Sequence, residues 1–585
     1  MGIGKKPAPS TSRSRERRSA TGLRKRAVPY GLLSPAALWL LLFFVLPTIF
    51  MLYTSLKSGG LLTGGSRFTW EVENYSEAIR LFRIQYVRSF EYAAIVTAAA
   101  LVLSYPLAYW IAFYGGRRKS SLLLVILLPF FVSYVIRTIQ WQFILGDEGI
   151  VLGTLKDRGL LSADFHVLAT PLAVIAGMAY NFLPFALLPI YVALERIDRA
   201  VVEAAEDLYS SRLQTFLRVV LPLSLPGVLS AFVLTFVPAA GDFINAEILG
   251  GPGTAMIGNI IQTQFLENRN YPLASALSFV VMLGLLVVAV GYGRILGTKD
   301  PGSTPVFFLG SGDVSGGLTH SRRAKGLSRL LLPLYALLMY AYLVLPIVIM
   351  VVFGFNDGEG RATAKWQGFT LRWYEELLAV PGLTTAVKNT FLIAVISTVV
   401  STILGTLLGL ALGRYRFRGH GLISFTVFLA IATPEIVLGT SLLTLFVAVS
   451  EVIPLGFPSI LIAHIMFSVS FVALVVRART EGVEHSLEEA SQDLWATPLY
   501  TFFKITIPMI LPGIVSGGLL AFALSVDDFV ITSFVSGQTE TFPIWVFGSS
   551  RIGIPSQVNA IGTLIFVFGA SLAIGNLLVQ RRRAR

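Results

Sequence analysis

Four carboxylic acids stand inside long apolar stretches of this chain. They are Asp242, Asp527, Asp528 and Glu435, the last in the run ATPEIVLG. An ionisable side chain among apolar residues is costly, so it usually faces a cavity or a partner and serves function. We therefore take these acids as candidates for binding a solute that carries positive charge.

Aromatic residues accompany the acids. Phe243 and Phe529 each follow an aspartate, and Tyr134 and Trp141 lie together in another apolar run. Carboxylates and aromatic faces together suit an organic cation, through ion pairing and cation–π attraction. We expect these eight residues to form a substrate site. The alternative is that the acids pair internally, for instance with Arg137, and only hold helices together.

The segment Glu203–Phe243 recurs as Glu489–Phe529. Of its 41 positions, 16 are identical in the second copy without a gap. Such similarity indicates an internal duplication. Each copy is polar and helix-forming, opens on Glu-Ala, and reaches a proline (Pro222 or Pro508) before a long apolar run. This pattern predicts a short surface helix that leads into a membrane helix.

The composition is that of a polytopic membrane protein: 54% of residues are hydrophobic and 14% are charged, against about 25% charged in an ordinary soluble domain. A spanning helix needs about 20 apolar residues, and twelve segments qualify. We expect twelve transmembrane helices in two parallel six-helix repeats. The segments are 32–56, 91–114, 121–145, 171–194, 222–246, 274–296, 328–354, 385–412, 422–449, 458–478, 508–532 and 558–580.

Four regions follow from this pattern. Residues 1–28 are rich in Ser, Arg and Pro and predict a disordered basic tail. Residues 29–296 and 328–585 are the two membrane halves, and residues 297–327 are rich in Gly, Ser and Pro, as in a flexible linker. Basic clusters in the tail, the linker, the loops after the second and eighth spans and the C-terminus place both termini in the cytoplasm.

The repeated segment resembles the EAA loop of ABC-importer permeases, on which a separate ATPase docks. The family usually has Gly six residues after the Glu, whereas this chain has Tyr209 and Trp495. The sequence therefore does not decide whether the loops keep the sharp bend. The resemblance implies a type I ABC-importer permease fold. The residues it implies for coupling to the ATPase are Glu203, Ala204, Ala205, Asp207, Tyr209, Glu489, Ala490, Ser491, Asp493 and Trp495.

Each half is also similar to one permease subunit of spermidine/putrescine importers. The segments that carry this resemblance are PFFVSYVIRTIQWQFILGDEG and GDFINAEILGGPGTAMIGNIIQTQF in the first half, and ATPEIVLGTSLL and LSVDDFVITSFVSG in the second. The resemblance implies a fused permease pair in a bacterial cell membrane that imports polyamines. It also implies a cytoplasmic ATPase dimer and an extracytoplasmic substrate-binding protein as partners, beside membrane lipid.

Other functions have less support in the sequence. No phosphate-binding loop G-x-x-x-x-G-K-[ST] occurs, so we expect no cofactor in this chain and ATP-Mg on the partner. There is no cysteine, and the five histidines show no metal-ligand spacing. Short scattered basic loops make no groove for nucleic acid. Import of ferric iron or another small solute, an ion-coupled secondary transporter and a membrane-embedded enzyme remain as alternatives.

Overall fold

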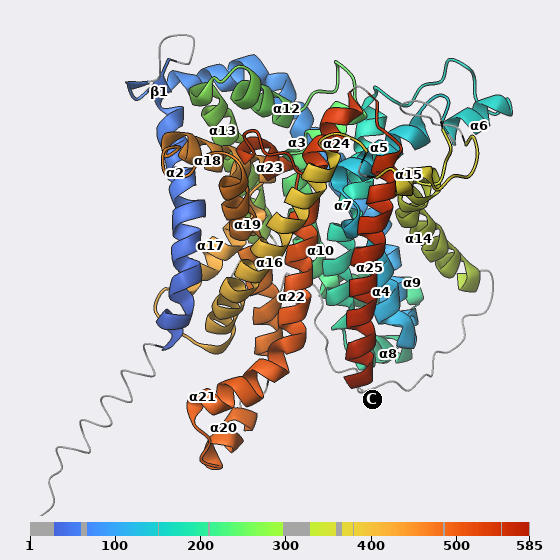
Figure 1. Cartoon of the computed structure of the whole chain (residues 1–585). Helices are drawn as coiled ribbons and strands as arrows, with labels where there is room; N and C mark the ends of the chain where they lie inside the picture. Colours follow the sequence, from blue (N-terminus) through green and yellow to red (C-terminus); the bar gives the residue numbers. More distant parts are fainter. Residues whose placement is uncertain are drawn as a thin grey trace, which may run out of the picture.

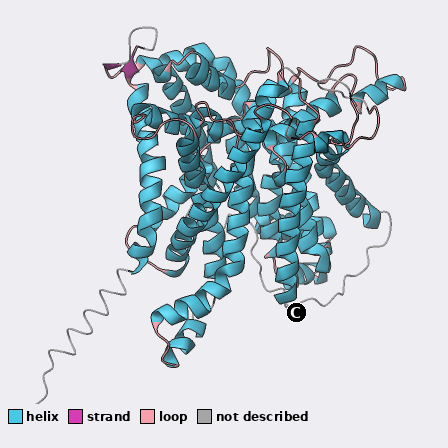
Figure 2. Ribbon diagram, viewed as in Figure 1, coloured by secondary structure: helices cyan, strands magenta, loops and turns pink. Residues whose placement is uncertain are grey.

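The computed structural model describes residues 28–59, 67–149, 151–208, 211–295, 328–358, 366–377, 379–483, 486–551 and 553–583. The expected linker 297–327, Tyr209 and all of the expected tail except Val28 lie outside these ranges. The described chain is a bundle of helices with one small hairpin (Figures 1 and 2). In that hairpin β1 (Lys57–Ser58) pairs antiparallel with β2 (Arg67–Phe68), and Lys57 stands opposite Phe68.

The first half runs from a helix over Val28–Ser55 to α13. Its elements are η1 (Leu41–Val45), α2 (Leu46–Ser55), α3 (Glu73–Tyr114), η3 (Gly116–Arg118), α4 (Lys119–Leu127), η4 (Leu128–Phe131), α5 (Tyr134–Leu145), α6 (Leu152–Asp157), α7 (Pro171–Glu195), α8 (Arg199–Asp207), α9 (Arg212–Thr215), η5 (Phe216–Val220), α10 (Leu221–Ala240), α11 (Ile244–Ile248), α12 (Ile257–Gln262), η6 (Thr263–Glu267) and α13 (Tyr271–Ile295).

The second half repeats this order. Its elements are α14 (Ser328–Phe353), α15 (Arg372–Glu375), α16 (Leu383–Arg414), α17 (His420–Ala432), α18 (Glu435–Ala448), α19 (Phe457–Glu481), α20 (Ser486–Asp493), α21 (Pro498–Thr501), η7 (Phe502–Thr506), α22 (Ile507–Asp527), α23 (Val530–Val535), α24 (Phe542–Ser550) and α25 (Gln557–Arg583).

Ten helices in the described ranges are long and apolar enough to cross a membrane, and there are twelve spans if each of two bent pairs counts as one. The predicted spans 121–145 and 422–449 are these bent pairs, so they are not straight helices. The chain turns by 91° between η4 and α5 and by 104° between α17 and α18. In the second turn Thr433 has an extended backbone, because the ring of Pro434 disfavours helix at the preceding residue.

The two copies of the repeat also share a π-helical turn. It covers Phe216–Val220 in the first copy and Phe502–Thr506 in the second, directly before α10 and α22. Pro222 and Pro508 stand two residues after these turns and lack the N–H that would bond to the carbonyl four residues earlier. The widened turn is a known way to accommodate such a break.

The first helix of each half packs against the other half. Helix α2 lies on α18, and α14 lies on α3 and α5. Tyrosine hydroxyls hold α14 against the first half: Tyr335 of α14 donates to the carbonyl of Leu103 in α3 at 2.6 Å, and Tyr180 of α7 donates to that of Leu343 in α14 at 2.9 Å. A continuous apolar core therefore runs through both halves.

The bundle has two unlike ends (Figure 1). Helices α8, α9, α20 and α21 lie at one end, together with the C-terminus of the chain. The hairpin, α6, α12 and α24 lie at the opposite end. The two copies of the repeated loop therefore point the same way, as expected of a parallel repeat.

Candidate functional site

Asp242 and Asp528 stand at breaks just beyond the ends of the repeated helices. Asp242 follows α10, and its carboxylate accepts the backbone N–H of Ile244 at 2.9 Å. Asp528 follows α22 and accepts the backbone N–H of Thr532 at 2.9 Å. Each carboxylate thus binds otherwise unpaired N–H groups at the start of a short helix, α11 or α23. The duplication has kept this local structure in both halves.

The side chains that hydrogen-bond to Asp242 are neutral. Its Oδ2 accepts the Tyr134 hydroxyl at 2.9 Å and the Asn245 amide at 2.5 Å, and the same amide lies 2.7 Å from the Tyr134 hydroxyl. The side chain of Asp242 is buried, with 6% exposure. No Lys, Arg or His forms a salt bridge with it in the part of the chain that the structure describes. Its charge therefore has hydrogen-bond donors but no counter-ion.

Asp528 is paired with a histidine instead. His464 Nε2 lies 3.2 Å from its Oδ2, and both side chains are 3% exposed. The two ring nitrogens of His464 also contact Ser525 Oγ at 2.7 Å and Thr532 Oγ1 at 2.8 Å. Thr532 hydroxyl donates to Asp528 as well. All of these groups belong to the second half, so this cluster fastens α19 to the end of α22.

Asp527 pairs across the two halves. Arg137 Nη2 of α5 lies 3.1 Å from its Oδ2, and the backbone N–H of Tyr134 donates to its Oδ1. The Arg137 side chain is 2% exposed. Its Nε and Nη1 are buried without a hydrogen-bond partner in the described chain. The internal pairing foreseen for Arg137 thus exists, and its partner is Asp527.

Glu435 is the first residue of α18, and its side chain is partly buried. Within the described residues its carboxylate makes no hydrogen bond or salt bridge. Helix α18 approaches the end of α10 so closely that a Cβ on Gly241 would lie 2.9 Å from the Cβ of Pro434. Glu435 is therefore a carboxylate at the junction of the halves that has no hydrogen-bonding or ionic partner in the described part of the chain.

The predicted aromatic residues divide into two groups. Phe243 and Phe529 meet across the halves with ring centroids 5.9 Å apart, and the Tyr134 ring lies 5.6 Å from the Arg137 guanidinium. Trp141 is elsewhere on α5: its ring packs 5.3 Å from Tyr180 in a second apolar cluster. The structure brings the first three residues to the acids and leaves Trp141 away from them.

The two repeated loops, on α8 and α20, carry exposed acids at the end of the bundle opposite to the hairpin. Glu203 and Asp207 on α8, and Glu489 and Asp493 on α20, are exposed. Ser491 is instead buried and contacts Thr501 Oγ1 at 2.9 Å. Among the other predicted positions of the loops, Ala204 and Ala490 are exposed and Ala205 is partly buried. Tyr209 lies outside the described residues.

Trp495 retains the bend that the usual glycine would give. Its φ angle is 64°, in the left-handed region that side chains other than glycine rarely adopt. Its side chain is 94% exposed, and neighbouring Leu494 is 83% exposed. The absence of glycine in this sequence therefore does not straighten the second loop. It places a large apolar side chain at the bend.

Three residues matter here that the sequence analysis did not select for the site. Asn245 binds Asp242, His464 binds Asp528, and Glu488 anchors the second loop. Glu488 lies 2.5 Å from Arg414 Nη2 and accepts the Thr506 hydroxyl at 2.6 Å. Asn245 and His464 are polar residues within apolar runs. The criterion that selected the acids could therefore have selected these two residues as well.

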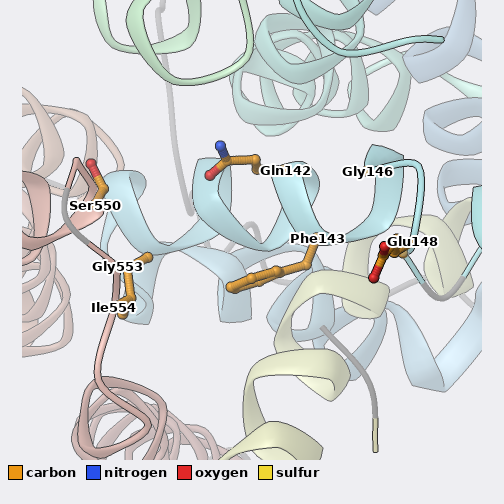
Figure 3. A pocket seen from close by; sticks show the side chains of 8 residues that line it. Gln142, Phe143, Gly146, Glu148, Ser550, Gly553 and Ile554 are labelled. Carbon is orange, nitrogen blue, oxygen red and sulfur yellow. The ribbon is translucent and has the colours of Figure 1, made fainter. Parts of the chain in front are cut away.

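A separate cavity of about 240 Å³ lies beside α5 and α24 (Figure 3), and Figure 1 shows both helices toward the end of the bundle that carries the hairpin. Its lining comes from the last turn of α5 and the loop after it, and from the end of α24 and the following loop: Gln142, Phe143, Gly146, Glu148, Gly149, Ser550, Gly553 and Ile554. None of the four acids lines it. Helix α5 thus has one end at the acids and the other at this cavity.

Comparison with known proteins agrees with this duplicated architecture. The family described as "Binding-protein-dependent transport system inner membrane component" matches twice, over residues 104–296 and 405–585. Putrescine transport system permease protein PotI of Escherichia coli is 41% identical over 237 residues, which is 39% of this chain and 83% of PotI.

Two further relatives have similar coverage. Spermidine/putrescine transport system permease protein PotB of Haemophilus influenzae is 36% identical over 255 residues, 43% of this chain and 88% of PotB. Spermidine/putrescine transport system permease protein PotC of Escherichia coli is 36% identical over 248 residues, which is 42% of this chain and 92% of PotC. Each relative is thus matched over most of its length by less than half of this chain.

Proposed function

This chain belongs to the family of binding-protein-dependent transport system inner membrane components, and we propose that it supplies both membrane halves of a polyamine importer. Two family matches in one chain, with helices in the same order in each half, make it a fused pair of permease subunits in the bacterial inner membrane. Its relatives PotI, PotB and PotC are permease proteins of putrescine or spermidine/putrescine systems. Their cargo is the basis for the substrate proposed here.

The observation that carries the substrate proposal is the set of four acids where the two halves meet. Asp242 and Glu435 have no counter-ion among the described residues, whereas Asp527 and Asp528 are paired with Arg137 and His464. A polyamine brings two or more ammonium groups on one flexible chain. Such groups form charge-assisted hydrogen bonds with carboxylates, which are stronger than neutral ones.

We assign roles to the acids from these partners. Asp242 and Glu435 would receive ammonium groups directly, since no resident cation has to leave them. Asp527 and Asp528 would contribute less to binding, because Arg137 and His464 already pair with them. The rings of Tyr134, Phe243 and Phe529 would flank the cargo and contribute cation–π attraction where a ring face is free.

The energy source would be a separate ATPase dimer docked on the two repeated loops. These loops lie at the same end of the bundle, and they present exposed acids and an exposed Leu494–Trp495 pair. The basic residues Lys119 and Arg414 lie at this end too, paired with Glu195 and Glu488. By the positive-inside rule this end faces the cytoplasm, and both termini with it. A binding protein would deliver the polyamine to the other end.

Reconstitution tests this proposal. The full chain would be placed in proteoliposomes with its cognate ATPase inside and its cognate binding protein outside, and uptake of labelled spermidine and putrescine would be measured with and without ATP. We expect ATP-dependent accumulation of at least one of them, and none when the binding protein is omitted. Uptake driven by an ion gradient without ATP would instead establish a secondary transporter. ATP-dependent uptake of ferric iron but of neither polyamine would retain the importer and reject the cargo.

A further inference from the structure

The ion pair between Arg137 and Asp527 joins the two halves of the chain at the proposed cargo site. Arg137 is on α5 of the first half, and Asp527 is the last residue of α22 in the second half. We propose that this pair is a latch: it holds α5 to α22, and arrival of a cationic cargo opens it. Arg137 is then a positioning residue that acts on the transport cycle through Asp527. This inference rests on the proposed function for the nature of the cargo.

The guanidinium is held in a way that allows release. Its salt bridge is a single contact of 3.1 Å, while Nε and Nη1 are buried without a hydrogen-bond partner in the described chain. A buried charge is stable only when it is both paired and hydrogen-bonded. Two of the three guanidinium nitrogens fall short of that here. By contrast, both ring nitrogens of His464 are engaged.

Tyr134 connects the latch to the cargo site. Its backbone N–H donates to Asp527 Oδ1, and its hydroxyl donates to Asp242 Oδ2 at 2.9 Å. An ammonium group that binds Asp242 competes with the Tyr134 hydroxyl for the same oxygen. It also repels the guanidinium, whose centre lies 5.6 Å from the Tyr134 ring. Both effects weaken the hold of α5 on Asp527.

Helix α22 connects the latch to the docking loop. Asp527 ends this helix of 21 residues, and η7, α21 and α20 lead directly into its other end. At 1.5 Å per residue the helix spans about 30 Å, most of the hydrocarbon thickness. A packed helix transmits displacement of one end to the other as a rigid body. Release of Asp527 would therefore reach the loop that contacts the ATPase.

The chain offers a direct test because it contains no cysteine. Glu206 on α8 and Gln492 on α20 are exposed and occupy matched positions of the repeat. Spin labels on Glu206→Cys and Gln492→Cys would report the distance between the two docking loops, in the full chain in nanodiscs without ATPase. We expect Arg137→Gln and Asp527→Asn to shift this distance equally, by more than the width of the wild-type distribution.

Two variants separate a latch from general loosening. Arg137→Lys keeps the cation and should leave the wild-type distance. Tyr86→Phe removes a buried hydrogen bond of 3.0 Å to the Leu277 carbonyl, which lies within one half and away from α22, and it should lower the melting temperature without moving the labels. The latch is overturned if neither Arg137→Gln nor Asp527→Asn moves the labels, if Arg137→Lys moves them as far as Arg137→Gln, or if Tyr86→Phe moves them equally.

Addition of spermidine or putrescine to the labelled wild type gives an independent readout of the cargo. We expect the added polyamine to shift the distance between the two labels toward the value measured for Arg137→Gln. If the polyamines have no effect while both latch variants still shift the labels, the latch stands and the proposed cargo fails. If the polyamines move the labels in the wild type but the latch variants do not, the cargo stands and the latch fails.

Discussion

Asp242 and Asp528 occupy the same position in the two halves but have different partners. Asp528 forms a buried salt bridge of 3.2 Å with His464, whereas Asp242 is held by the neutral groups of Tyr134 and Asn245. The difference comes from single positions: Asn245 corresponds to Ile531, and His464 has Met178 at the same spacing in the first half. The duplicated backbone therefore presents one carboxylate held by neutral groups and one paired with a histidine.

The first prediction concerns Asp242. Asp242→Asn preserves the shape of the side chain but removes a charge-assisted contact with the cargo, which is worth roughly 1.5–3 kcal/mol. We expect spermidine uptake at subsaturating concentration to fall about ten- to a hundredfold, with membrane abundance and basal ATPase activity close to wild type. Uptake of labelled spermidine, normalised to the amount of protein in the membrane, measures it. Unchanged uptake would return Asp242 to a purely structural role.

Asp528→Asn is the matched substitution in the other half, and it should act differently. It leaves His464 without its carboxylate, and breaking a buried ion pair costs about 3–5 kcal/mol when the histidine is charged. We expect a lower melting temperature and a lower abundance, with uptake per folded molecule less affected than in Asp242→Asn. Thermal unfolding followed by intrinsic fluorescence gives the comparison. Equal melting temperatures for the two variants would contradict the assignment.

A further prediction separates binding from stability at Glu435. This carboxylate has no hydrogen bond or salt bridge within the described residues. Glu435→Gln therefore removes no protein contact, so the melting temperature should stay close to wild type. Polyamine uptake should nevertheless fall, because a cargo contact is lost. A drop in melting temperature similar to that of Asp528→Asn would show that Glu435 has a structural partner.

Variants of Trp495 separate the effect of the bend in the second repeated loop from the effect of the exposed Trp495 side chain. A left-handed backbone costs a non-glycine residue of the order of 1 kcal/mol, so Trp495→Gly should keep the bend and relieve this strain. It should also weaken ATPase binding, since the exposed indole is gone. Trp495→Val should be worse, because a β-branched residue resists the bend as well. Binding of the purified ATPase to each variant measures both effects, and equal affinity in all three would exclude a contact through Trp495.

The last prediction concerns the acids that head the loops. Glu203→Lys and Glu489→Lys reverse charge at exposed matched positions, and each should abolish the ATP hydrolysis that the loaded binding protein stimulates, with the permease still inserted. The two defects need not be equal, because Arg414 and Thr506 hold the second loop through Glu488. Glu481→Lys, at an exposed position that pairs with Arg477 in the same helix, is the control. Normal stimulation in both loop variants would reject the docking assignment.

Much of the architecture follows from the sequence alone. Backbone groups in hydrocarbon must be satisfied within the segment, so a long apolar run has little alternative to a helix. The repeat of Glu203–Phe243 at Glu489–Phe529 then requires two halves of the same orientation. Asp242 and Asp528 were identifiable for the same reason, because a charge in such a run is exceptional.

Tertiary structure decided which groups meet. The sequence analysis placed Trp141 beside Tyr134 at the acids, but α5 turns it to Tyr180, and two predicted spans proved to be bent. Arg137 and Asp527 are 390 residues apart, and their contact depends on how helices of opposite halves cross. Hydropathy and spacing constrain each helix separately. They do not fix the rotation and crossing of helices from different halves. A salt bridge forms only where this rotation and crossing bring two side chains within a few ångström of each other.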